Sequence, residues 1–131
     1  MDELVAGLLE QSVTVLVDVR LTPLLRKPGL SKRKLAEALE AVGIRYLHLR
    51  ALGNPKDNRA PFRAGDPDSH AVFLRLIAEG EGALALRHVA ELLDGQTVAL
   101  LCFERDHDIC HRHLVASELQ RAEPSLALIR L

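Results

Sequence analysis

The chain has 131 residues, of which 48% are hydrophobic and 27% charged, and this ordinary composition argues against a disordered chain. Its formal net charge of −1 provides no global positive field that would draw the protein onto nucleic acid. Aromatic residues make up only 3%, too few for a base-stacking surface. No apolar run approaches the roughly 20 residues that span a bilayer, and the acidic N-terminus lacks the basic start of a signal peptide. We therefore expect a folded cytoplasmic protein with no membrane contact.

The first part of the chain predicts helices and strands in alternation. Residues 2–10 place apolar side chains on one helical face, and the β-branched run 13–20 is typical of a strand buried on both faces. A loop with two prolines follows, and a second helix is expected to begin after Ser31 and to end at Gly43. Residues 44–50 predict the second strand.

The second part of the chain opens with a long polar stretch, residues 51–68, which is rich in Gly and Pro. We expect a loop there, and a loop of this length in a compact domain is usually functional. The remaining elements are two helices, a buried strand, a further helix and a final strand, expected at 69–79, 83–94, 97–103, 110–121 and 125–131.

Strands separated by helices predict a parallel sheet joined by right-handed crossovers. We expect a single three-layer α/β domain over 1–131, in which helices cover both faces of a mainly parallel sheet of about four strands. Ligands of such sheets bind beyond the carboxyl ends of the strands. Asp18, Arg20, the 51–68 stretch and the 102–112 segment all fall at that edge, so we expect the functional site there.

Both cysteines lie in residues 102–113, the segment with the highest density of ionisable and reactive side chains. In the cytoplasm, cysteines are expected to be reduced thiols, ligands or catalysts rather than a structural bridge. Cys110 lies at the predicted start of a helix beside His111 and Arg112, and a helix N-terminus and nearby cations favour the reactive thiolate. Cys102 ends a strand. In anion-binding sites that are built from a strand, a loop and a helix, the nucleophile lies at this position. The alternative for both is a small buried core side chain.

Charged groups around these thiols predict an anion site. Arg112, Arg20 and the free N–H groups of the last helix could hold a phosphate or a carboxylate. The alternative is a salt bridge from Arg112 to Glu104 or Asp18. The two carboxylates end two strands, so they are candidates for acid–base work or for pairing with an arginine.

The second strand carries two residues with weaker signals. Tyr46 is expected in the core. His48 alternates with Leu47 and Leu49 and so faces the opposite way, which favours a histidine that is hydrogen-bonded within the sheet over a ligand.

Two other classes of function remain open. Cys102, His107, Cys110 and His111 could supply zinc ligands, but their spacing is not that of paired zinc knuckles and adjacent helical side chains point apart, so we assign no metal. The basic region 20–63 could dock a protein or a nucleic acid, although nucleic acid is not favoured. The sequence assigns no cofactor.

Four separated stretches carry a family resemblance: LVDVR (16–20), GIRYLHLRALG (43–53), ALLCFE (99–104) and CHRHLVASEL (110–119). The chain resembles a bacterial and archaeal family known as domain of unknown function 488, whose most characteristic feature is Cys-x-Glu followed by Cys-His-Arg. The resemblance implies a small α/β fold and no established reaction. It also implies that seven residues are drawn together: Asp18, Arg20, Cys102, Glu104, Cys110, His111 and Arg112.

Members of that family usually begin with a strand, whereas this chain begins in the helix at 2–10. An open sheet edge is therefore expected, and such an edge would allow a homodimer.

The leading hypothesis is a thiol-dependent enzyme, or a degenerate relative that only binds, whose ligand is a small anion such as a nucleotide or another phosphate compound. Cys110 or Cys102 would be the nucleophile or redox thiol, and His111 or Glu104 would handle protons. The residues expected to bind the ligand are Asp18, Arg20 and Arg112.

Overall fold

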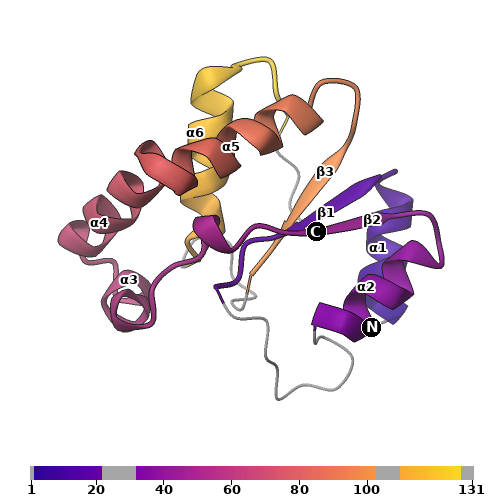
Figure 1. Cartoon of the computed structure of the whole chain (residues 1–131), viewed down its shortest axis with the longest axis horizontal. Coiled ribbons are helices and arrows are strands. Elements are labelled where there is room, and N and C mark those ends of the chain that lie inside the picture. Colours follow the sequence, from indigo (N-terminus) through magenta and orange to yellow (C-terminus); the bar gives the residue numbers. More distant parts are fainter. Residues whose placement is uncertain (1, 22–31, 103–109, 128–131) are drawn as a thin grey trace.

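The computed structural model describes residues 2–21, 32–102 and 110–127, and within these ranges it confirms the α/β class (Figure 1). The helices are α1 (Asp2–Glu10), α2 (Lys32–Glu40), α3 (Arg59–Arg63), α4 (Pro67–Ala78), α5 (Gly80–Leu92) and α6 (Arg112–Ala122). The strands are β1 (Val15–Asp18), β2 (Arg45–His48) and β3 (Val98–Leu101), and two short 3-10 turns are η1 (Arg50–Leu52) and η2 (Lys56–Asn58).

The sheet is parallel, as the sequence predicts, and its strand order in the described part of the chain is β2-β1-β3. Val15 of the central strand pairs with Arg45 on one side and with Val98 on the other. The fourth strand expected at 125–131 is not seen over residues 125–127, and its remainder lies outside the described residues. The polar end of β1 thus lies between two neighbouring strands.

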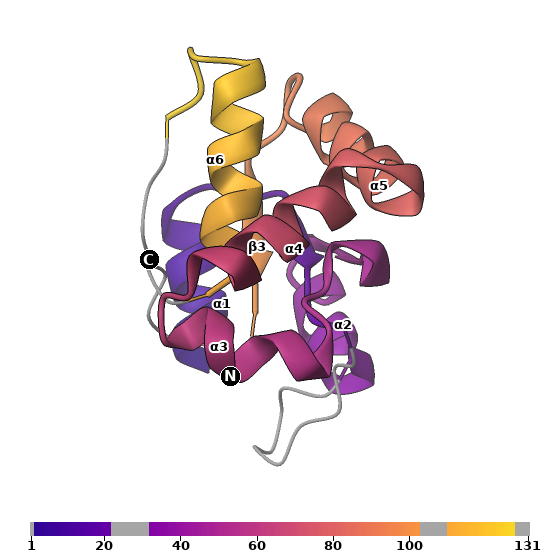
Figure 2. The ribbon, with the colours of Figure 1, turned by 90° about the vertical axis from the view of Figure 1, so that its left-hand side faces the viewer.

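Side chains of β1 alternate between two cores, one on each face of the sheet. Leu16 packs in a core with residues of α1 and α2, while Val15, Val17 and Val19 join a larger core with residues of α4, α5 and α6. Figure 1 shows α1 and α2 on one side of the sheet and α5 and α6 on the other. Figure 2 looks onto this second layer, where α4 lies in front of β3. The three-layer arrangement follows from this alternation.

The segment 51–68 differs from the loop that its composition predicts, since it contains most of η1, all of η2 and α3. Phe62 of α3 is buried and packs edge-on against Phe73 of α4, with ring centroids 6.0 Å apart. The side chain of Asn58 donates to the backbone carbonyl of Ser69 and accepts from the Ser69 hydroxyl. A buried ring and these bonds give the segment a fixed course across the sheet edge.

No helix in the described ranges is both long enough and apolar enough to cross a membrane.

Gly53 allows the chain after η1 to pass close to the end of β1. A Cβ atom on Gly53 would lie 2.6 Å from the Leu21 Cα and 2.7 Å from its backbone nitrogen, much closer than van der Waals contact allows. Because backbone atoms on both sides cannot easily move, only glycine fits here. This close approach fixes the course of the chain just beyond β1.

Replacing Gly53 with alanine is therefore expected to lower the free energy of unfolding by about 1–3 kcal/mol, the usual cost of overpacking. Urea unfolding followed by circular dichroism measures it. Gly7→Ala is the matched control, because Gly7 lies in α1 with open space around it and alanine favours helix by about 0.5–1 kcal/mol. Equal midpoints for Gly53→Ala and the unmodified chain would contradict the close approach.

Candidate functional site

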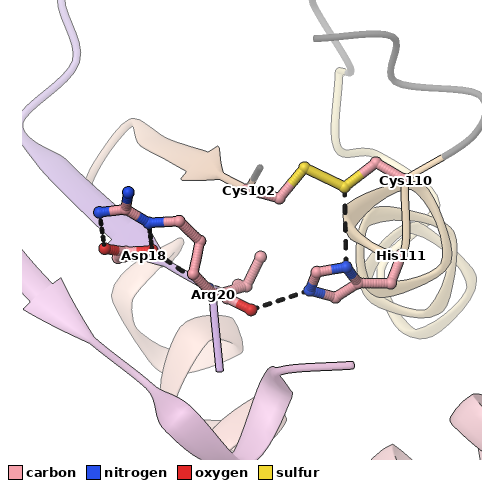
Figure 3. The surroundings of a disulfide bond; sticks show 6 residues. Asp18, Arg20, Cys102, Cys110 and His111 are labelled. Atoms are coloured by element: carbon pink, nitrogen blue, oxygen red, sulfur yellow. Dashed lines mark hydrogen bonds and ion pairs between the residues drawn. A yellow bond between two sulfur atoms is a disulfide. The ribbon is translucent and has the colours of Figure 1, made fainter. Parts of the chain in front are cut away.

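Asp18 and Arg20, the two polar residues at the end of β1, form a buried ion pair (Figure 3). The Arg20 Nε donates to Asp18 Oδ1 at 2.8 Å, and Nη2 donates to Oδ2 at 2.6 Å. The Arg20 backbone N–H also donates to Asp18 Oδ1 at 3.1 Å. Both side chains are almost completely buried. The pair therefore closes a compact turn at the strand end, and these N–H groups of Arg20 are engaged by Asp18.

Tyr46 completes this buried pair from the neighbouring strand. Its hydroxyl donates to Asp18 Oδ2 at 2.5 Å. Burial, followed by the hydrogen bond to Asp18, raises the pKa of Tyr46 above its ordinary value of 10.0, and the charge of Arg20 together with its side-chain hydrogen bond opposes that rise. The hydroxyl therefore keeps its proton and serves as a donor to the carboxylate.

Two histidines bind the successive backbone carbonyl groups that follow Asp18. His48 Nε2 lies 2.7 Å from the carbonyl oxygen of Arg20, and His111 Nε2 lies 2.8 Å from that of Val19. A carbonyl oxygen can only accept, so each Nε2 must carry the hydrogen. His48 comes from β2 and His111 directly precedes α6, so these bonds tie three segments of the chain together.

The bond to Val19 fixes which nitrogen of His111 is available for chemistry. With the proton on Nε2, the neutral ring has an unprotonated Nδ1 with a free lone pair. Burial lowers the pKa of His111 below 6.5; the bond to Val19 opposes this, while the charges of Arg59 and Arg112 add to it. The imidazole is therefore neutral near pH ~7 and can accept a proton at Nδ1.

The lone pair of His111 faces the sulfur of Cys110, at a distance of 3.7 Å between Nδ1 and Sγ (Figure 3). The ring also packs against Phe73, whose centroid lies 5.2 Å from that of the imidazole in a T-shaped arrangement. A sulfur, an imidazole and a backbone carbonyl thus form a line of contacts from α6 to β1.

Cys102 and Cys110 are joined by a disulfide, so the expectation of two reduced thiols is wrong for this structure. Cys102 follows β3 and Cys110 precedes α6, and both belong to the larger core on β1. Parallel packing brings the end of β3 and the start of α6 to the same point. The expectation of reduced thiols rested on the cytoplasmic compartment, and it did not consider that the fold brings the two cysteines together.

Five of the assigned residues lie around the end of β1 in two groups (Figure 3): the paired Asp18 and Arg20 side chains form one, and Cys102, Cys110 and His111 form the other. The Val19 carbonyl, which accepts from His111, links the two groups. Arg112 begins α6 and its charge acts on His111. Glu104 and His107 lie outside the described residues.

Sequence reasoning gave Arg59 no role at the site, although its charge acts on His111 from the start of α3. The expectation that His48 is a hydrogen-bonded sheet residue is confirmed. Tyr46, expected in the core, is half-buried and bonds to Asp18. The position of Tyr46 two residues before His48 places both on one face of β2, a signal that could have linked Tyr46 to Asp18.

Among the described residues, no cluster of three or more His, Cys, Asp or Glu side chains could hold a metal ion. The zinc hypothesis uses the sulfurs of Cys102 and Cys110, which here are bonded to each other.

A family model matches residues 1–119, and its description is domain of unknown function DUF488. The match covers most of the chain, which therefore belongs to this family, as the four sequence stretches predicted. Comparisons with curated proteins and with solved structures find no match.

The lowered pKa of His111 predicts a pH dependence of stability. Above pH 6.5 the ring is neutral in both the folded and the unfolded chain, and its contribution is fully present. As the pH falls below 6.5, the unfolded chain takes up the proton first, so the contribution shrinks until the pH reaches the lower folded pKa. The difference in unfolding free energy between the unmodified chain and His111→Gln should therefore be smaller at pH ~5.5 than at pH ~7.5.

Urea titrations of both chains at the two pH values measure this difference, in which the other titrating groups cancel. His88→Gln is the matched control, because His88 lies on α5 and makes none of the bonds described at the end of β1. If the difference in unfolding free energy between the unmodified chain and His111→Gln stays constant or grows on acidification, the ring is not neutral and buried.

Proposed function

We propose that the chain is a thiol-dependent enzyme in which Cys110 is the reactive cysteine and His111 its base, and that it acts on a small anionic ligand. The observation that carries the proposal is the pair of contacts on His111. Nε2–H is bound by the Val19 carbonyl at 2.8 Å, and Nδ1 lies 3.7 Å from the Cys110 sulfur.

These contacts match what an activated cysteine requires. A nucleophilic thiol needs a base within reach, and the base in turn needs a third group that orients it. Once the disulfide is reduced, the Cys110 thiol can donate its proton to Nδ1 of His111, and the Val19 carbonyl stabilises the resulting imidazolium through Nε2–H. The thiolate formed in this way is the nucleophile.

Positive charge around the thiol supports an anionic ligand. Arg112 begins α6, and the first N–H groups of that helix favour negative charge. Arg59 brings a second guanidinium from α3, and both charges act on His111. The site lies at the carboxyl end of the sheet, where α/β proteins bind ligands.

In this proposal Asp18 and Arg20 position the end of β1 and do not contact the ligand directly. Their side chains are buried and bound to each other. Their role is to hold the Val19 carbonyl in the direction that His111 requires.

Alkylation of the reduced chain tests the proposal. In Cys102→Ser, which keeps Cys110, the rate of reaction with iodoacetamide should rise with a pH midpoint below the ordinary thiol value of about 8.5, because His111 accepts the proton. Adding His111→Gln should move that midpoint back toward about 8.5. Cys110→Ser, which keeps Cys102, is the matched control and should show the higher midpoint.

The same reaction run with iodoacetate tests the anionic ligand, because the two reagents differ in charge and share the electrophilic carbon. The rate ratio of iodoacetate to iodoacetamide should be higher in the folded chain than in urea, and Arg59→Gln should lower it. A Cys110 midpoint that is unchanged by unfolding would sink the thiol mechanism. If the rate ratio of iodoacetate to iodoacetamide is the same in the folded chain and in urea, the proposal of an anionic ligand is wrong.

A further inference from the structure

We propose that Cys102 and Cys110 form a reversible redox pair that exchanges with a small anionic thiol, and that the incoming sulfur bonds to Cys102 while Cys110 departs. The proposal rests on the function above, because it uses the same activated Cys110. It adds a second reactive cysteine, a direction of attack and a chemical class of substrate.

The two sulfurs differ in their surroundings. Both cysteine residues are buried, with 7% of Cys102 and 2% of Cys110 exposed. The Cys110 sulfur faces the imidazole of His111, which lies on the side of α6 (Figure 3). Because the imidazole lies against the Cys110 sulfur, the attack is directed at Cys102.

The chemistry of departure favours the same direction. In thiol–disulfide exchange, the sulfur that better stabilises negative charge leaves more readily. Cys110 directly precedes His111 and the first turn of α6, so its thiolate lies at a helix N-terminus with the positive charge of Arg112 nearby. The N-terminus of α6 lies at Cys110, whereas Cys102 directly follows β3.

The reductive step balances as follows. A small thiolate attacks the Cys102 sulfur, a new S–S bond forms between them, and the Cys102–Cys110 bond breaks with its electron pair on Cys110. A second small thiolate then attacks the sulfur of the first small thiol, which releases Cys102 as a thiolate and yields the small-molecule disulfide. Two electrons pass from the two thiols to the protein, and the two protein thiolates take up protons.

The oxidative step uses His111. The Cys102 thiolate first attacks the small-molecule disulfide, which forms a mixed disulfide on Cys102 and releases one small thiolate with its electron pair. The Cys110 thiol then gives its proton to Nδ1, and the Cys110 thiolate attacks the Cys102 sulfur of the mixed disulfide. The small thiol leaves with the electron pair, and the imidazolium returns its proton to the departing thiolate through solvent. His111 thus acts as a base on the Cys110 proton, and its bond to Val19 keeps Nδ1 aimed at that sulfur.

The expected compartment agrees with reversibility. Disulfides of cytoplasmic proteins are usually transient and belong to catalysts or redox sensors. The positive charges of Arg59 and Arg112 beside His111 favour a thiol that carries a negative charge. Glutathione has this chemistry and is the probe of choice.

The test is to equilibrate the full chain over a series of ratios of reduced to oxidised glutathione, quench with acid, and measure intact mass and peptide masses. We expect the disulfide to open and to re-form as the ratio changes, and the trapped intermediate to carry glutathione on Cys102. Cys110→Ser should accumulate this Cys102 adduct, because it lacks the thiol that displaces glutathione. An adduct found mainly on Cys110, or a disulfide that does not re-form, overturns the proposal.

Replacing His111 with glutamine separates a chemical role from a merely structural one. The variant should close the disulfide about 10²-fold more slowly at neutral pH, the usual effect of losing a general base. Above pH ~9 the thiol ionises without help, so the two rates should converge. A deficit that is the same at all pH values would contradict the role of His111.

The alkylation and exchange experiments distinguish a failure of the redox pair from a failure of the proposed function. If Cys110 of the reduced chain alkylates with a low pH midpoint but oxidised glutathione does not close the disulfide, the thiol enzyme stands and the redox pair is wrong. If the midpoint is ordinary, the proposed function itself fails.

Discussion

The hydrogen bond between His111 Nε2–H and the Val19 carbonyl is the contact on which the rest of the site depends. It joins the start of α6 to the end of the central strand, and it leaves Nδ1 without a proton. A ring with the opposite tautomer would present an N–H to the Cys110 sulfur and could not accept the thiol proton. One buried bond therefore decides whether the cysteine beside it has a base.

The surrounding structure holds the acceptor of this bond in place. Asp18 and Arg20 close the strand end through a buried ion pair, and Tyr46 donates to the same carboxylate. Gly53 lets the chain beyond β2 approach the backbone just after Arg20. The desolvation of a buried ion pair costs free energy that can offset the attraction between the two charges. The pair can nevertheless specify one geometry, which here is the direction of the Val19 carbonyl.

Much of the fold follows from local sequence patterns, and the site only in part. The run at 13–20 is apolar on both faces, which identified β1 and placed Asp18 and Arg20 at its end. The Gly and Pro content of residues 51–68 predicts a loop, and it gives no sign of the buried Phe62 or of the Asn58–Ser69 bonds that order the segment. The Val19–His111 bond joins residues 92 positions apart, and the disulfide joins two cysteines 8 positions apart that lie in different elements, so neither contact follows from a helical or strand period.

The most direct measurement of the central claim is the tautomer of His111, read from the two-bond proton–nitrogen correlations of the ¹⁵N-labelled, oxidised chain. His111→Gln identifies the signals. Near pH ~7 we predict a neutral ring with its hydrogen on Nε2 and a bare Nδ1. A hydrogen on Nδ1, or a doubly protonated ring at that pH, would contradict the arrangement and leave Cys110 without its base.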